Sequence, residues 1–407
     1  MRHWWLAAVL LAAACTSSGS GPTPPTTPAH SSPTSRAGSP SAPPPSSRPF
    51  STSGASSDTS SDTTTTLAQR VLAAMSLRQR VGQLLMVDCP TSGLGAATAQ
   101  AVQTYHVGSV ILDGTTYAGR AEMAALTGQL QRLAPRHLGL LIATDQEGGL
   151  VQRLQGTGFT RIPSGVAQGT IAPATLRADA RHWGGQLHAA GVNVNLAPVL
   201  DVVPSGFGAN PPIGDLDREY GHTPAAVTSH GIAVARGFLA SGVAPTVKHF
   251  PGLGRVHGNT DLTGGVTDAV TTATDPYLAP FRAAVKDGMP IVMMSTAIYA
   301  RIDPGKPAAF SAKIVTGLLR GTLGFRGLVI SDDVGGAAQV ANVPIGDRAV
   351  RFVAAGGDVV LTVDAGQAQP MTDALVAAAR KSRAFRAKVD AAALRVLQEK
   401  QRLGLLG

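Results

Sequence analysis

The chain has 407 residues, a formal net charge of +9 and 44% hydrophobic residues, a length that permits one large barrel or two ordinary domains. Its positive charge suits anionic surroundings such as a cell envelope, or serves solubility alone. Because the Lys and Arg residues form no cluster interleaved with aromatic ones, the sequence argues against nucleic acid as a partner.

The first 15 residues have the pattern of a secretory signal peptide. A basic start precedes the apolar run 4–14, and Cys15 follows two alanines. The run is too short to span a bilayer as a helix of the mature protein. The segment is similar to a bacterial lipobox, in which the cysteine is lipidated, although Ala12 stands where Leu is usual. We therefore expect a secreted protein held at the bacterial envelope membrane by acyl chains on Cys15, with a simple cleaved signal peptide as the alternative.

Residues 16–66 are rich in Ser, Thr, Pro and Gly. The segment lacks the apolar side chains that offset the entropy cost of ordering a chain, so we predict a disordered tether. The other cysteine, Cys89, follows an apolar run and is expected to be a small buried residue. With Cys15 lipidated, no internal disulfide is possible.

From Leu67 onward, short apolar runs alternate with amphipathic stretches of helical length. The apolar runs are residues 82–87, 107–112, 138–143, 192–196, 243–247, 290–294, 328–330 and 359–363. Helix-like segments include 122–133, 225–241, 308–323 and 370–381, and a basic helix is expected at 390–403. Strands that alternate with helices are typical of parallel βαβ units, and strands apolar on both faces are typical of buried parallel sheets.

About eight such units in residues 67–407 predict an α/β fold, a single (β/α)8 TIM barrel. The alternative is a doubly wound open sheet. No Gly-x-Gly-x-x-Gly follows the first run, which argues against this alternative. Polar residues follow nearly every run: Asp88, Asp113, Asp145, Asp201, Lys248, His249, Ser295, Asp332 and Asp364. Barrel active sites gather at these C-terminal strand ends, so we expect some of these residues to contact substrate and others to cap turns.

Three stretches carry candidate chemistry. Asp332 and Asp333 end a strand, and two carboxylates that flank a glycosidic bond are able to hydrolyse it, although Ser-Asp-Asp is equally a helix N-cap. Lys248 and His249 begin a Lys-His-Phe-Pro-Gly segment, where both could hold sugar hydroxyls or simply precede a structural turn. The stretch 145–153 combines strand-end acids, a Gly-Gly turn and an Arg. The histidines have no spacing typical of metal ligands, so no metal site is predicted.

Together and in this order, these stretches resemble glycoside hydrolase family 3, in particular its single-domain β-N-acetylglucosaminidases, which recycle cell-wall fragments. The resemblance covers Leu67 to Gly407 and implies a retaining, exo-acting enzyme that removes terminal β-linked N-acetylglucosamine from peptidoglycan fragments (muropeptides). It implies Asp332 as the nucleophile of a covalent glycosyl-enzyme. It implies no metal or organic cofactor, and we expect a monomer. The residues implied to hold the sugar hydroxyls are Asp145, Arg153, Arg218, Lys248 and His249.

The general acid is where the sequence departs from this family. The subgroup carries Asp-Ser-His at this point and uses the His as acid, whereas this chain reads Asn259-Thr260-Asp261. Asp261 could be the acid, with its pKa raised by burial; His257 could replace it; or protonation could be impaired. Leu150 and Leu253 are further departures, since relatives usually carry Arg and often carry His there.

Two other functions remain open. One is a β-glucosidase or β-xylosidase of the same family, which shares the nucleophile and differs around the C2 substituent of the sugar. The other is a catalytically weak envelope lipoprotein that binds muropeptides, which only the departure at 259–261 supports. The family's larger β-glucosidases usually take their acid from a second domain. Since the sequence ends at Gly407, we expect the acid to come from a barrel loop, which favours the glucosaminidase subgroup.

Overall fold

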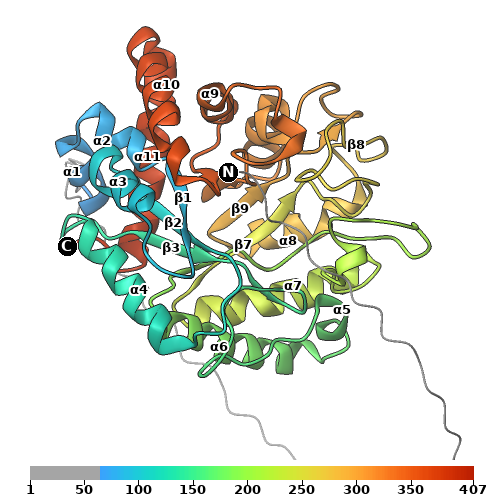
Figure 1. Ribbon diagram of the computed structural model, residues 1–407. Helices are drawn as coiled ribbons and strands as arrows, with labels where there is room; N and C mark the ends of the chain where they lie inside the picture. Colours follow the sequence, from blue (N-terminus) through green and yellow to red (C-terminus); the bar gives the residue numbers. More distant parts are fainter. Residues whose placement is uncertain (1–64) are drawn as a thin grey trace, which may run out of the picture. The chain divides into compact units, whose positions relative to one another are not determined.

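The computed structural model describes residues 65–407, and Figure 1 shows these residues as a barrel of strands surrounded by helices. The predicted signal peptide, Cys15 and all but the last two residues of the predicted tether lie outside the described residues. Cys89 is buried and carries a free thiol.

Eight parallel strands form the barrel, in the order β11-β9-β7-β6-β3-β2-β1-β12. Their bounds are β1 (Leu85–Pro90), β2 (Ser109–Asp113), β3 (Leu141–Thr144), β6 (Val194–Asn195), β7 (Ala244–Phe250), β9 (Ile291–Met294), β11 (Leu328–Ser331) and β12 (Val360–Thr362). A parallel bridge between Ile330 and Val359 joins the two end strands, and the Ser331 amide donates to the Val359 carbonyl at 2.9 Å. Every predicted apolar run overlaps one of these strands, so the predicted TIM barrel is confirmed.

Two short strand pairs lie in the loops. β4 (Gln146–Gly148) pairs antiparallel with β5 (Val151–Gln152), and β8 (Thr267–Asp268) pairs with β10 (Ile298–Tyr299). The α-helices are α1 (Leu67–Ala74), α2 (Leu77–Gly82), α3 (Ala96–Tyr105), α4 (Arg120–Leu133), α5 (Gly165–Gln168), α6 (Pro173–Ala189), α7 (Pro224–Ala240), α8 (Ala279–Lys286), α9 (Ile345–Ala355), α10 (Ala368–Lys381) and α11 (Arg383–Arg402). Short 3-10 turns are η1 (Gly214–Leu216), η2 (Pro276–Leu278), η3 (Ala308–Phe310), η5 (Ala338–Val340) and η6 (Ala365–Gln367). From residue 65 onward, no helix is long and apolar enough to cross a membrane.

Two predicted helices differ from the observed ones. The single helix expected at 308–323 is divided into η3 and a π-helix, η4 (Lys313–Thr322), because the Ser311 hydroxyl donates to Asp303 at 2.7 Å and accepts the Ile314 amide. The last helix begins at Arg383 rather than at residue 390. There the Ser382 hydroxyl accepts the Phe385 amide as an N-cap, which satisfies a donor at the helix start.

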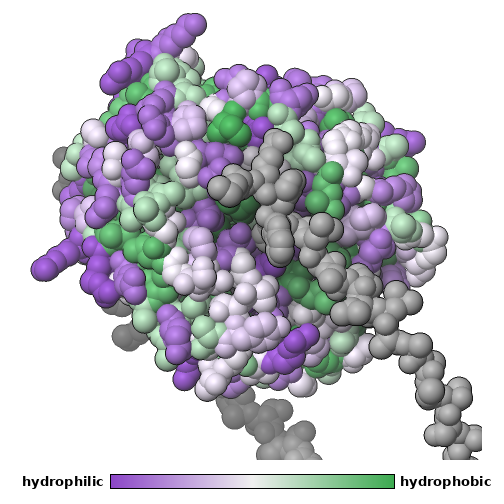
Figure 2. Space-filling model, in the orientation of Figure 1, coloured by the Kyte–Doolittle hydropathy of each residue, from purple (hydrophilic) through white to green (hydrophobic). Residues whose placement is uncertain are grey.

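The strands separate two apolar cores. Along β1, Met86 points into the barrel interior, while Leu85 and Val87 belong to the core between strands and helices. At the N-terminal end of the barrel, Leu405 packs against the interior cluster, and its carbonyl accepts the Gly139 amide at 2.8 Å. The C-terminal segment therefore closes this end, and the opposite rim is left to the loops that follow the strands. On the face drawn in Figure 2, hydrophobic residues form small patches among hydrophilic ones.

A lysine is buried at the closed end. Lys400 of α11 is fully buried, and its Nζ donates to Oε1 of Gln83 at 2.7 Å, just before β1. Burial disfavours the charged form and lowers the pKa of Lys400 to about 7. Since the same lysine titrates at its ordinary, higher pKa in the unfolded chain, its protonated form opposes folding.

This pKa shift predicts a pH-dependent effect of Lys400→Met. Between about pH 7 and the unfolded pKa, the unfolded chain binds the proton that the folded chain has lost, so wild-type stability rises with pH. The stability difference, which is the free energy of unfolding of Lys400→Met minus that of wild type, should be largest below about pH 7. It should decrease by roughly a few kcal/mol by pH 10. Thermal unfolding across this range measures it. The exposed Lys381→Met is the control, and a pH-independent difference for Lys400→Met would contradict the prediction.

Candidate active site

The predicted site residues lie at the C-terminal ends of β3, β7 and β11 or in the connections that follow β3, β6 and β7. Asp145 directly follows β3, Lys248 and His249 lie near the end of β7, and Asp332 directly follows β11. Lys248 and His249 are buried, and the peptide bond between them is cis. Arg218 comes from the loop between β6 and α7. These elements are separated in sequence, but their strand ends share one rim of the barrel.

A buried carboxylate, Glu147, joins two of the cations. Arg218 donates to it through two nitrogens, Nε to Oε2 at 2.9 Å and Nη2 to Oε1 at 2.7 Å. Lys248 Nζ lies 2.6 Å from Oε1 of Glu147 and 2.7 Å from Oδ1 of Asp145. Burial alone would raise the pKa of Glu147, but the charges of Arg218 and Lys248 outweigh burial and hold that pKa well below its usual range. The carboxylate therefore stays ionised.

Sequence reasoning missed Glu147, although it singled out the stretch that contains it. Its position is set by a tight turn in the β4–β5 hairpin. Gly148 has a φ of +116°, and a Cβ there would lie 2.1 Å from the Pro163 carbonyl oxygen, so only glycine fits. The same hairpin returns to Arg153, whose amide donates to the Asp145 carbonyl at 3.1 Å. A Gly-Gly turn directly after an acid was the signal available in the sequence.

The second network centres on Asp201. Its buried carboxylate accepts hydrogen bonds from the amides of His249 at 3.2 Å and Leu253 at 2.7 Å, and its Oδ2 lies 2.6 Å from Nδ1 of the His249 ring. An ionised carboxylate only accepts hydrogen bonds, so Nδ1 carries the proton and Nε2 is the ring nitrogen left to bond a ligand. Asp201 thus positions His249 and the loop that follows it.

The two adjacent aspartates after β11 have different surroundings. Asp333 accepts amide hydrogen bonds from Gly335, Gly336 and Val363 at 2.8, 2.9 and 3.2 Å, so it holds the loop. Burial and the charge of Asp332 outweigh these bonds and raise the pKa of Asp333 to about 6. Asp332 accepts one amide hydrogen bond, from Asp333 at 3.0 Å, and remains half-buried. Of the two, Asp332 is the carboxylate with capacity left for chemistry.

Asp261 belongs to the same cluster of carboxylates. Its loop is fixed to the chain after Asp332, because the Ala338 amide donates to the Asp261 carbonyl at 3.1 Å and the Gln339 amide donates to the Thr260 carbonyl at 3.0 Å. The side chain reaches solvent. Partial removal from water nevertheless raises the pKa of Asp261, and the charges of Asp332 and Asp333 raise it further, to about 7. A carboxyl group with this pKa is able to donate a proton near neutral pH.

His257, the other candidate acid, has different neighbours. Its ring is stacked on Phe207, with 4.4 Å between ring centroids, and its Nδ1 lies 3.1 Å from the Ala209 carbonyl oxygen. These contacts hold the ring against the 207–209 loop. A catalytic role for His257 stays a prediction.

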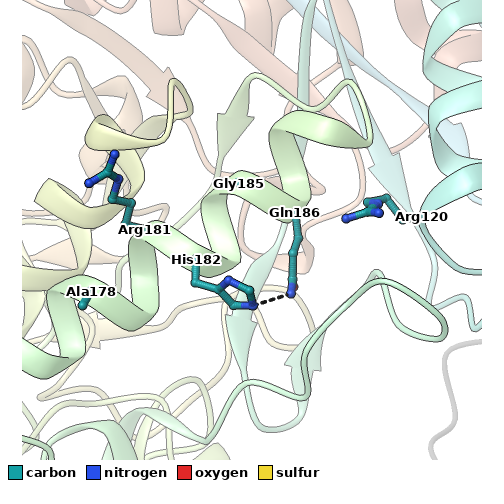
Figure 3. Close-up of a pocket in the computed structure, with 6 residues that line it drawn as sticks. All are labelled: Arg120, Ala178, Arg181, His182, Gly185 and Gln186. Atoms are coloured by element: carbon teal, nitrogen blue, oxygen red, sulfur yellow. Dashed lines mark hydrogen bonds between the residues drawn. The ribbon is translucent and has the colours of Figure 1, made fainter.

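One hollow on the described surface, of about 460 Å³, lies away from these residues. It lies on the outer side of α6 and contains none of the predicted site residues; Figure 3 shows Gln186 of its lining bonded to His182. In the part of the chain that the structure describes, no three His, Cys, Asp or Glu side chains are grouped to hold a metal ion. The predicted site residues lie instead at the rim, where burial and the charge of Asp332 raise the pKa of Asp261. Paired carboxyl groups of unlike surroundings suit acid and nucleophile roles in glycosidic bond cleavage.

Comparison with known proteins agrees with this chemistry. The signature of the "Glycosyl hydrolase family 3 N terminal domain" matches residues 76–398. The chain is 36% identical over 268 residues to a β-hexosaminidase of Xylella fastidiosa, covering 63% of this chain and 76% of that protein. It is 34% identical over 294 residues to one of Xanthomonas oryzae pv. oryzae, covering 68% and 83%.

Solved structures give the same family. The crystal structure of a β-N-acetylhexosaminidase from Beutenbergia cavernae superposes with a TM-score of 0.79 at 49% identity, covering 81% of this chain and 99% of that one. A glycoside hydrolase family 3 β-N-acetylglucosaminidase from Paenibacillus sp. superposes with a TM-score of 0.76 at 34% identity, covering 82% and 63%.

The Glu147 network predicts a large stability loss for Glu147→Gln. Removing the charge leaves the buried cations Lys248 and Arg218 undercompensated, so the free energy of unfolding should fall by about 3 kcal/mol at pH 7. Because the folded-state pKa of Glu147 is lowered, its contribution is lost as the pH falls below its unfolded value, and the difference from wild type should narrow there. Urea unfolding measures it. The exposed Glu122→Gln should stay within about 0.5 kcal/mol of wild type, and an equal effect of both variants would refute the prediction.

Proposed function

The chain belongs to glycosyl hydrolase family 3, and from this membership we propose that it is a retaining, exo-acting β-N-acetylglucosaminidase with Asp332 as nucleophile. Membership makes it a glycoside hydrolase. The β-hexosaminidases and β-N-acetylglucosaminidases among its relatives support a β-linked N-acetylhexosamine as the sugar that is released.

The mechanism rests on the place of Asp261, whose loop is bonded to the chain that follows Asp332, and on its pKa, which burial and the charge of Asp332 raise. In the first step Asp332 attacks the anomeric carbon, the bond from that carbon to the leaving oxygen breaks, and Asp261 gives its proton to this oxygen. The covalent bond removes the negative charge of Asp332, which had raised the pKa of Asp261. Without that charge the pKa of Asp261 falls, so Asp261 remains ionised after it has given up its proton. As carboxylate it takes a proton from water, the water oxygen attacks the anomeric carbon, and the bond to Asp332 breaks.

The cation network supports binding of the sugar hydroxyls. Lys248 has three donors, of which Asp145 and Glu147 occupy two. Arg218 has five, of which two bond Glu147 and one bonds the Pro212 carbonyl. Donors therefore remain for a ligand, and the buried carboxylate holds them in place before substrate arrives, which lowers the entropy cost of binding. Asp145, His249 through Nε2, and Arg153 complete the proposed set.

We propose muropeptides with terminal N-acetylglucosamine as natural substrates, and a monomeric enzyme anchored at the envelope through a lipid on Cys15. The lipobox-like sequence and the Ser/Thr/Pro-rich segment after it support this location. A β-glucosidase or β-xylosidase shares the nucleophile and is the alternative within the family. The muropeptide-binding protein is less well supported, because the pKa of Asp261 is raised, as a general acid requires.

Substrate preference tests the proposed function. The domain 65–407 should hydrolyse 4-nitrophenyl β-N-acetylglucosaminide faster than the matching β-glucoside, with the β-anomer as first product in NMR. Asp332→Asn should lower kcat at least about 10⁴-fold with an unchanged unfolding temperature, because the covalent step is lost. Preference for the glucoside would favour the β-glucosidase alternative. Activity of Asp332→Asn near that of wild type would show that Asp332 is not the nucleophile.

The acid is tested by pH and leaving group. Since an acid must be protonated to act, kcat/KM for a disaccharide should fall as the pH rises through about 7, where Asp261 ionises. Asp261→Ala should remove this fall of kcat/KM with pH and lower kcat/KM about 10²–10⁴-fold for the disaccharide. For the 2,4-dinitrophenyl glycoside, whose phenolate leaves without a proton, the loss should be less than about tenfold. His257→Ala is the matched comparison. If His257→Ala rather than Asp261→Ala shows this pattern, His257 is the acid.

A further inference from the structure

Exposed apolar side chains concentrate on the rim that carries the proposed site. Within residues 65–407, the large hydrophobic side chains that are clearly exposed are Tyr117, Leu150, Val166, Leu262 and Val270. All of them lie in connections that leave the C-terminal ends of β2, β3 or β7. A single exposed hydrophobic residue needs no explanation, but a restriction to the catalytic rim points to contact with a ligand.

Leu262 has the most informative position, because it directly follows Asp261. It is 75% exposed, the largest exposed fraction among these side chains. A fixed turn holds it there. The amides of Leu262 and Thr263 donate to the Asn259 carbonyl at 3.1 and 2.8 Å, and the Asp261 amide donates to the Asn259 side chain at 2.9 Å.

The turn is also anchored at both sides. The Thr260 and Asp261 carbonyls accept amides from η5, and the Gln339 side chain bonds both the amide and the carbonyl of Val266, at 2.8 and 3.1 Å. The backbone therefore holds Leu262 in its exposed position. Because the loop is already ordered, covering Leu262 with a ligand would cost little conformational entropy of the loop.

The chemistry of the proposed reaction places the leaving group next to this turn. A group that protonates the glycosidic oxygen lies at the boundary between the bound sugar and the leaving group. We infer that Leu262 forms an apolar contact for the leaving group, so that the enzyme favours leaving groups with a hydrocarbon face, such as the C–H face of a second pyranose or an aryl ring. This inference rests on the proposed function, with Asp261 as acid.

Leu150 provides a matched control on the sugar side of the site. It is 71% exposed and lies at the turn of the β4–β5 hairpin, which carries Glu147 and leads from Asp145 to Arg153. A hydrogen bond also fixes this turn, because the Gly149 amide donates to the Ile162 carbonyl at 3.0 Å. The two leucines therefore share residue type and exposure, but only Leu262 adjoins the acid.

The experiment compares leaving groups in Leu262→Ser, Leu262→Met and Leu150→Ser. The substrates are N-acetylglucosaminyl β-fluoride, whose leaving group has no carbon, the 4-nitrophenyl glycoside, and N,N′-diacetylchitobiose. Leu262→Ser should lower kcat/KM about tenfold for the last two, mainly through KM, and change fluoride hydrolysis less than about twofold. Leu262→Met should restore most of the loss, and Leu150→Ser should leave the ratio between substrates at its wild-type value.

Each outcome decides the inference. Equal losses of Leu262→Ser on all three substrates, no loss on any, or the same leaving-group dependence in Leu150→Ser would overturn it. Failure of the wild-type domain to hydrolyse the fluoride would instead refute the proposed function, and this inference with it. Thermal unfolding of each variant separates a loss of contact from a loss of folded protein.

Discussion

The charged contacts of Glu147 connect three parts of the chain that the site needs together. Glu147 lies on the hairpin after β3, Arg218 in the loop after β6, and Lys248 on β7, and the bonds between them are 2.6–2.9 Å long. A buried charge is tolerated only when partners and hydrogen bonds compensate the loss of water. The position of each loop therefore depends on the other two, and one carboxylate fixes both Arg218 and Lys248.

The surroundings at this rim shift the pKa values of two carboxyl groups in opposite directions. Burial disfavours ionisation of both Glu147 and Asp261. Two cations reverse that effect at Glu147, whereas two aspartates reinforce it at Asp261. One group is therefore kept charged for structure, and the other carries a proton near neutral pH. Neighbours, rather than residue type, therefore separate a carboxylate that stays ionised from a carboxyl group that is able to donate a proton near neutral pH.

Local sequence patterns predicted what depends on local contacts. The barrel strands were predictable because short apolar runs recur between helix-like segments, most of them apolar on both faces, and the residues at their ends followed from the parallel topology. The start of α11 was predictable because the buried Phe385 and Val389 lie four residues apart, as on one face of a helix. The division of the helix at Ser311, in contrast, depends on Asp303 in the preceding loop. Glu147 was missed for a related reason. Its partner Arg218 lies 71 residues away, and no local pattern encodes that pairing.

Buried ion pairs stabilise both ends of the barrel. At the closed end, Leu405 seals the interior and buried Asp358 pairs with Arg320 and Arg395, so side-chain packing and ion pairs determine the structure there. At the open rim, the ion pairs of Glu147 hold some of the loops, and backbone hydrogen bonds hold others, as between Thr260 and Gln339. Backbone bonds do not depend on which side chain a residue carries. A substitution of Asp261 or Leu262 is therefore expected to change the proposed acid or the proposed leaving-group contact without altering the barrel that positions it.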